Sequence, residues 1–186
     1  MRSSYHTTRR LSLAAAIAGV AVSLALPATA SAQMRLDPVR VTASRVAEAN
    51  ALSDKALSFY STPSKYKYAA TLHLRAANLR APGDAKGYED LNMAAHLFRA
   101  AGAVWNAREA MEKAAAHAAA RGDVVSAAKS YVDAGFLAIE ERRTDRVPAL
   151  ALKAELLAKS PLITDEQRAS IMNRVGYSQV VAMIPR

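Results

Sequence analysis

The sequence predicts an all-α fold of about seven helices, and three observations support this prediction. Hydrophobic residues make up 52% of the 186 residues but aromatic residues only 6%, and alanine supplies much of the apolar content. Alanine is the best helix former and a poor strand residue. No long stretch alternates polar and apolar residues with the period of two that a half-buried strand requires. Proline, glycine and capping residues also divide the chain after position 32 into segments of helix length.

Length and composition limit the classes of protein to consider. A chain of 186 residues fits one domain, and the absence of cysteine excludes disulfides, thiolate zinc sites and cysteine catalysis. The formal net charge is +9, and residues 33–83 carry 8 basic against 3 acidic side chains. Such a segment would suit anionic lipid or an acidic protein, although a solvated helix surface is the simpler interpretation. No basic run is dense enough to indicate a nucleic-acid partner.

Residues 1–32 have the layout of a secretory signal peptide. Arginines precede an apolar stretch from Leu11 to Leu26, which Pro27 ends, and small residues follow up to Ala32. We therefore expect cleavage after Ala32 and export to the periplasm or beyond. The apolar stretch is shorter than a spanning helix needs, so no membrane anchor is expected to remain. Arg9-Arg10 partly matches a twin-arginine signal, but Ser12 stands where that signal has an aromatic residue, which favours Sec export.

Caps and breakers predict seven helices in the rest of the chain. Asp90 and Asp123 are candidate N-caps, and Thr164 with Gln167 has the spacing of a capping box. The predicted helices are, in order, Thr42 or Ser44 to about Tyr60, about 65–80, Leu91 to about Gly102, Trp105 to Gly122, Asp123 to about Arg142, Asp145 to Ser160, and Thr164 to Gly176. The apolar residues 180–184 are expected to dock as a lid on the last helix.

Packing residues recur between these helices. A small–aromatic–small pattern in the third helix returns 33 residues later in the fifth, and the even-numbered helices share an apolar–small pattern at steps of 39 residues. Such residues let helices approach closely and stack as antiparallel pairs. The predicted packing residues are Phe98, Ala101, Tyr131 and Ala134 in the odd-numbered helices, and Leu72, Ala76, Met111, Ala115, Leu150 and Ala154 in the even-numbered ones.

These residues resemble a known repeat family. Gly122-Asp123 followed by Ala127, Tyr131 and Ala134 looks like the turn and second helix of a tetratricopeptide (TPR) repeat. The resemblance implies a short right-handed α-solenoid with three helix pairs over residues 65–176, after an N-terminal segment and first helix at 33–64 and before a tail at 177–186. The pattern is divergent, since the usual first-helix aromatic residue is absent from all three pairs and Asn173 stands at the aromatic place of the third. A plain helical bundle is the alternative.

The resemblance also implies a groove on the first helix of each pair, where partners bind. The residues expected to face this groove are His73, Arg80, Glu109, Glu112, Ala116 and Glu155. Their mixed charge argues against a groove of the carboxylate-clamp type. Ordinary solvated helix surface is the simpler interpretation of each of these positions.

No residues form a convincing enzyme or metal site. His73, His96 and His117 lack the local spacing of metal ligands, so no metal and no cofactor are expected. The pairs Glu109 with Glu112 and Glu140 with Glu141 suit surface salt bridges better than acid–base catalysis. We therefore predict that the chain is not an enzyme.

Another short stretch, residues 39–45, resembles the TonB box of outer-membrane receptors, which binds by strand addition. A lead-in to the first helix explains these residues equally well.

The function predicted from the sequence is an exported, non-enzymatic TPR-like scaffold or adaptor that binds another envelope protein or peptide, with self-association as a further expectation. The competing hypothesis is a periplasmic helical bundle that binds a ligand or a metal through converging histidines. Cell-wall hydrolysis is a third, weaker alternative.

Overall fold

The computed structural model describes residues 38–184, and these residues form seven α-helices and two short 3-10 helices. The elements are α1 (Pro38–Leu57), η1 (Pro63–Lys65), α2 (Tyr66–Leu79), α3 (Ala85–Ala100), α4 (Val104–Ala120), α5 (Val124–Glu140), η2 (Thr144–Arg146), α6 (Val147–Ala158) and α7 (Asp165–Met183). No strand occurs in this part of the chain. The predicted all-α class and the predicted number of helices are therefore confirmed. The signal peptide predicted at 1–32 lies outside the described residues.

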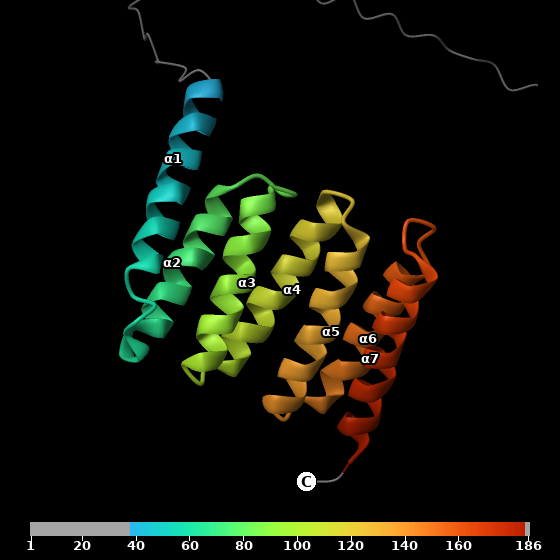
Figure 1. Cartoon of the computed structure of the whole chain (residues 1–186). Helices are drawn as coiled ribbons and strands as arrows, with labels where there is room; N and C mark the ends of the chain where they lie inside the picture. Colours follow the sequence, from blue (N-terminus) through green and yellow to red (C-terminus); the bar gives the residue numbers. More distant parts are fainter. Residues whose placement is uncertain (1–37, 185–186) are drawn as a thin grey trace, which may run out of the picture. The chain divides into compact units, whose positions relative to one another are not determined.

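The helices pack in the order in which they occur in the chain. Each one lies against its predecessor and its successor, so that α1 to α7 follow one another across the domain (Figure 1). The further substantial contact is between α5 and α7. None of the helices in residues 38–184 combines the length and the apolar character needed to cross a membrane.

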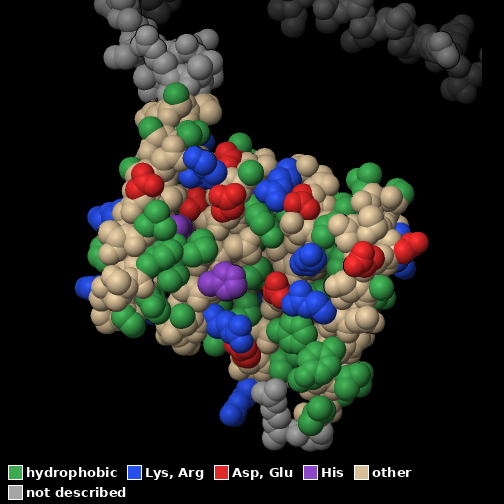
Figure 2. Space-filling model, in the orientation of Figure 1, with side chains coloured by type: hydrophobic (Ala, Val, Ile, Leu, Met, Phe, Trp, Pro, Cys, Tyr) green, Lys and Arg blue, Asp and Glu red, His purple; other side chains and the backbone are tan. Residues whose placement is uncertain are grey.

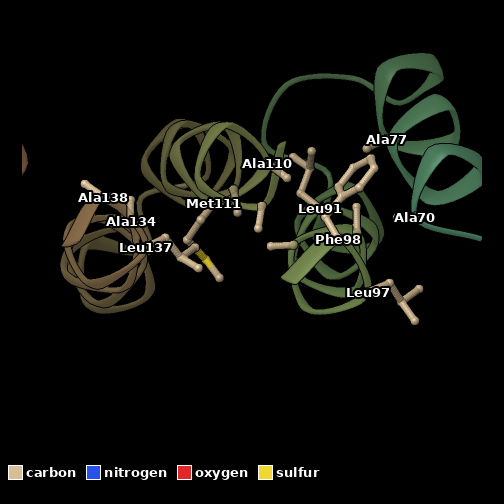
Figure 3. Packing of buried hydrophobic residues seen from close by; sticks show 14 of the residues in the cluster. Ala70, Ala77, Leu91, Leu97, Phe98, Ala110, Met111, Ala134, Leu137 and Ala138 are labelled. Carbon is tan, nitrogen blue, oxygen red and sulfur yellow. The ribbon is translucent and has the colours of Figure 1, made fainter. Parts of the chain in front are cut away.

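Alanine makes the close packing possible. The larger of two buried clusters extends from α1 to the start of α6, and more than half of its buried residues are alanines. In Figure 3, Leu91 and Phe98 of α3 project toward alanines of neighbouring helices, and Met111 of α4 points toward Leu137 of α5. The smaller cluster joins α5, α6 and α7 around Val132, Ile171 and Val175. Tyr131 packs against both clusters.

Most of the predicted packing residues lie in these clusters or beside them. Those that are buried are Leu72, Ala76, Phe98, Met111, Ala115, Ala134, Leu150 and Ala154. Tyr131 is half-buried, as its position between the two clusters requires. Ala101 is an exception, because it is the C-cap residue of α3 and is exposed. The expectation that Ala101 packs between helices is wrong, since α3 ends one residue before it.

Some helix ends follow the predicted caps. Asp123 caps α5 through a hydrogen bond from the backbone N–H of Ser126, and Thr164 with Gln167 forms the complete capping box of α7. Both caps satisfy amides that the first helical turn leaves without partners.

Other ends differ from the prediction. Asp84, rather than Asp90, caps α3, so this helix begins at Ala85, more than one and a half turns before the expected Leu91. At the end of the chain, α7 continues through Gly176 to Met183, so residues 180–183 belong to the helix and do not form a separate lid. The contacts of α7 with α5 and α6 outweigh the low helix propensity of one glycine.

The first helix also begins earlier than predicted. Residues 39–45, which resemble a TonB box, belong to α1, because this helix begins at Pro38 rather than after a cap at Thr42 or Ser44. Proline is well suited to the first position of a helix. Strand addition by this segment would therefore require α1 to unwind at its start.

Candidate partner-binding cleft

A cleft of about 410 Å³ lies between α3, α5 and α7. We call it the α3–α5–α7 cleft. Figure 2 shows one face of the molecule, on which basic and acidic side chains gather beside a histidine near the middle. The side chains that matter for its chemistry are His96 and Arg99 of α3, Asp133, Phe136 and Glu140 of α5, and Arg174, Tyr177 and Val181 of α7.

Helical spacing explains why these side chains meet. Asp133, Phe136 and Glu140 of α5 are three or four positions apart, and so are Arg174, Tyr177 and Val181 on α7. Residues at this spacing lie on one face of a helix. The direct contact between α5 and α7 places their two stripes side by side, and α3 closes the opposite wall.

Two ion pairs cross the cleft between neighbouring odd-numbered helices. Arg99 of α3 pairs with Glu140 of α5, with Nε 3.0 Å from Oε2, and Arg174 of α7 pairs with Asp133 of α5. All four side chains are at least one-third exposed. Exposed pairs of this kind contribute little to the free energy of folding, because water screens them. They can therefore exchange partners at low cost when another molecule binds.

An aromatic pair forms part of the cleft wall. The rings of Phe136 and Tyr177 lie with their centroids 6.0 Å apart, and the guanidinium of Arg174 lies 5.7 Å from the centre of the Phe136 ring. Tyr177 is 64% exposed although it is a large side chain. Exposed aromatic residues beside arginine are typical of the residues that dominate binding energy in protein interfaces.

A second hollow continues the cleft toward the C-terminal end of α7. This α5–α7 hollow has a volume of about 350 Å³ and shares Ile139 and Val181 with the α3–α5–α7 cleft. Its remaining lining residues are Arg142, Thr144, Ala182, Met183 and Ile184. The two hollows together follow the line where α5 meets α7.

The cleft is not on the helices where the sequence analysis placed the groove. That prediction put the groove on α2, α4 and α6, whereas this cleft lies among α3, α5 and α7. Glu109 and Glu112 line a different, smaller hollow of about 340 Å³, together with the exposed Trp105. Ala116 is exposed on α4, and Glu155 of α6 is half-buried with Gln179 of α7 3.4 Å away.

His73 and Arg80 were expected on the groove surface, and this expectation is wrong. Both side chains are buried, because both bind the buried carboxylate of Asp90. His73 Nδ1 lies 2.8 Å from Oδ1 of Asp90, and Arg80 Nε donates to Oδ2 at 3.0 Å. Ser53 of α1 also donates to this carboxylate, at 2.7 Å. The Asp90 network therefore ties α1, α2 and α3 together.

The turn between α1 and α2 belongs to the same network. The Tyr60 hydroxyl lies 2.5 Å from Nε2 of His73. One neutral tautomer of His73 satisfies both contacts, with Nδ1–H donating to Asp90 and Nε2 accepting from Tyr60. Burial and the nearby Asp90 charge raise the pKa of Tyr60, which keeps its hydroxyl a donor. Burial also acts to raise the pKa of Asp90, but hydrogen bonds from His73, Ser53 and Arg80 outweigh it and leave this pKa below its usual value.

The other two histidines considered as metal ligands, His96 and His117, lie elsewhere. His96 is exposed in the α3–α5–α7 cleft, and His117 packs against the backbone of Gly87, where an added Cβ would lie 2.9 Å from the imidazole ring. Within residues 42–184, no group of three or more His, Asp or Glu side chains is placed to hold a metal ion. Of the glutamates weighed as catalytic pairs, Glu112, Glu140 and Glu141 are each bound to an arginine.

Sequence reasoning missed the residues that form the cleft. Phe136, Arg174 and Tyr177 did not stand out, because the repeated pattern in the odd-numbered helices was interpreted only as packing. The sequence feature that could have indicated the cleft is the spacing of Asp133, Phe136 and Glu140. This spacing places charged and aromatic side chains on one face of a helix that is otherwise strongly apolar.

Comparisons with family models, with characterised proteins and with solved structures find no significant match to this chain.

Proposed function

We propose that this protein is an exported, non-enzymatic scaffold or adaptor of the TPR-like type, which binds a segment of another envelope protein in the α3–α5–α7 cleft. The observation that carries the proposal is the cleft itself, an open hollow of about 410 Å³ with the half-buried Phe136 and the exposed Tyr177 paired in its wall and ion pairs across it. Sequential packing of antiparallel helices, as in repeat proteins, suits such surfaces.

The shape of the hollow favours a peptide segment over a compact small molecule. The cleft and the α5–α7 hollow share Ile139 and Val181, so the two lie next to each other along α5 and α7 and together can serve as a binding track. A helical or extended segment can follow such a track and place apolar side chains against Phe136, Tyr177 and Val181. Polar side chains of the segment would then compete for Arg99 and Arg174, whose present pairs are exposed.

Export is the part of the proposal that rests on the sequence alone. If residues 1–32 are removed as a signal peptide, the protein isolated from its source cells begins at Gln33. Its intact mass, measured on material from the periplasmic or culture fraction, tests this directly. A full-length mass in the cytoplasmic fraction alone would contradict export.

Site-specific photocrosslinking tests the binding site. The full chain is expressed in its source cells with a photoreactive amino acid at Tyr177, in the cleft, or at Met172, which is exposed on the same helix but does not line the cleft. We expect irradiation to join a discrete partner at position 177 and not at 172. The adduct should disappear when His96 and Arg99 are both replaced by alanine.

Two outcomes would overturn the proposal. One is the absence of any adduct at 177 although the protein is folded and correctly located. The other is the same set of adducts at 172 and 177, which would indicate random collisions rather than binding in the cleft.

A further inference from the structure

Three successive helix–helix turns share one backbone geometry. In the turns after α3, α4 and α5, the N–H groups of Ala103, Asp123 and Arg143 donate to the carbonyl oxygen five residues earlier, at 2.8–2.9 Å. The residue before each of these donors has a positive φ: 71° at Gly102, 79° at Gly122 and 62° at Arg142. This is the Schellman arrangement, in which the left-handed position normally belongs to glycine.

Arg142 is therefore an exception with a backbone cost. A side chain in the left-handed region is strained by its Cβ, whereas glycine is not. Among the described non-glycine residues, Arg142 alone has a positive φ. Strain of this kind persists where the side chain has a use, and it is a reason to ask what that side chain does.

The Arg142 side chain lines the α5–α7 hollow and has no carboxylate partner among the described residues. The other arginines near the two hollows, Arg99 and Arg174, each hold a carboxylate, and so does its neighbour Arg143. Arg142 is exposed, and apolar side chains line the hollow beside it, including Met183, which is 79% exposed, and Ile184, which is 57% exposed.

This combination points to a particular ligand chemistry. An arginine can bind a carboxylate through two parallel hydrogen bonds, and a bound segment that covers the pair with apolar side chains would strengthen it by excluding water. A segment that buries aliphatic side chains against Ile139, Val181 and Met183 would bring its next polar residue to the guanidinium. The charge that complements this unpaired cation is an acidic side chain.

We propose that Arg142 determines the specificity of the binding track, by pairing with an Asp or Glu side chain that follows apolar residues in the bound segment. This inference rests on the proposed function, because it assumes that a segment binds along α5 and α7. It adds the chemistry of that segment and the residue that selects it.

Selection from a library of displayed random 16-residue peptides tests the inference on the mature chain. The peptides are internal to the display protein, so every carboxylate they offer is a side chain. Wild type should enrich peptides in which Asp or Glu follows two or more apolar residues. A selected peptide, synthesised with blocked ends, should bind Arg142→Gly about tenfold or more weakly, the loss expected for a hydrogen-bonded charge. Arg142→Glu should select Lys or Arg in place of the acidic residue.

Matched controls separate specificity from folding. Arg146→Glu makes the same change of charge nearby but outside the α5–α7 hollow, and it should leave the selected sequences unchanged. Arg142→Gly should not unfold the turn, since the equivalent positions are Gly102 and Gly122, and its thermal midpoint should equal or exceed that of wild type.

The outcomes distinguish the two proposals. Selected peptides whose binding requires Tyr177 but is unaffected by Arg142→Gly and Arg142→Glu would overturn the inference and leave the proposed function standing. If no selected peptide loses affinity in Tyr177→Ala, the binding track itself is wrong, and both proposals fail.

Discussion

At the scale of single residues, we expect the residue at the left-handed position of the turn after α5, Arg142, to affect stability. Arg142→Gly should raise the free energy of unfolding by about 0.5–1 kcal/mol, because it removes the steric cost of a Cβ at a φ of 62°. The reciprocal change, Gly122→Ala, should lower it by about 1 kcal/mol, although nothing lies within 4 Å of the added Cβ. Urea unfolding followed by circular dichroism measures both changes. A loss of stability in Arg142→Gly would show that the arginine contributes to the fold.

A second prediction at this scale concerns the buried alanines and their effect on stability. Ala115 of α4 is completely buried, and its neighbour Ala116 is exposed on the same helix. Ala115→Leu should destabilise the protein by about 1–3 kcal/mol, because the extra carbon atoms force α4 away from its neighbours. Ala116→Leu should change the free energy of unfolding by less than about 0.5 kcal/mol. Equal effects of the two substitutions would show that the rotational phase of α4 is wrong.

At the scale of helices, Asp90 joins α1, α2 and α3, so its charge should stabilise the packing of these three helices. Asp90→Asn should cost about 3 kcal/mol at pH 7, since it leaves the buried Arg80 without its carboxylate partner. The pKa of Asp90 is lower in the folded protein than in the unfolded chain. Its stabilising effect is therefore complete above the unfolded pKa, about 4, and is lost as the pH falls through the folded pKa.

The pH dependence of unfolding checks this sign. The difference in the free energy of unfolding between wild type and Asp90→Asn should be constant from pH 7 to about pH 5. It should become smaller below about pH 4. Asp54→Asn, an exposed change on α1, should track wild type throughout. A gap that stays constant down to pH 2 would mean that Asp90 is not ionised in the folded protein.

The helices also show how far a sequence can be interpreted. The caps at Asp123 and Thr164 could be predicted because local hydrogen bonds between near neighbours define them. Asp90 was interpreted as a cap for the same reason, yet its partners come from two other helices, 10 to 37 residues away. Gly176 was interpreted as a helix end, although tertiary packing carries α7 past it. Local signals are therefore dependable where the partner is local and mislead where it is not.

At the scale of the whole molecule, the number of helices was predictable but the position of the cleft was not. The periodicity of small and apolar residues identifies most of the packing face of each helix, as Phe98 and Ala134 illustrate. Whether the surface is hollow over the odd-numbered or the even-numbered helices depends on how the helices are offset and inclined, and α5 and α7 touch while most helices contact only their neighbours in the chain. A pattern within one helix, such as Asp133, Phe136 and Glu140 of α5, can indicate a polar and aromatic face, but it does not encode how the helices are offset around that face.

Sequential packing also predicts how a local change spreads. The two buried clusters are separate apart from shared contacts such as Tyr131, so the loss of one should loosen mainly its own helices. Ile171→Ala should cost about 2–5 kcal/mol and speed amide exchange in α6 and α7 much more than in α2 and α3. Leu91→Ala, in the larger cluster, should speed amide exchange in α2 and α3 much more than in α6 and α7. Hydrogen–deuterium exchange with peptide-level mass spectrometry resolves the two patterns. If both variants accelerate exchange equally in all seven helices, the domain unfolds as a single cooperative unit, and the two buried clusters do not act independently.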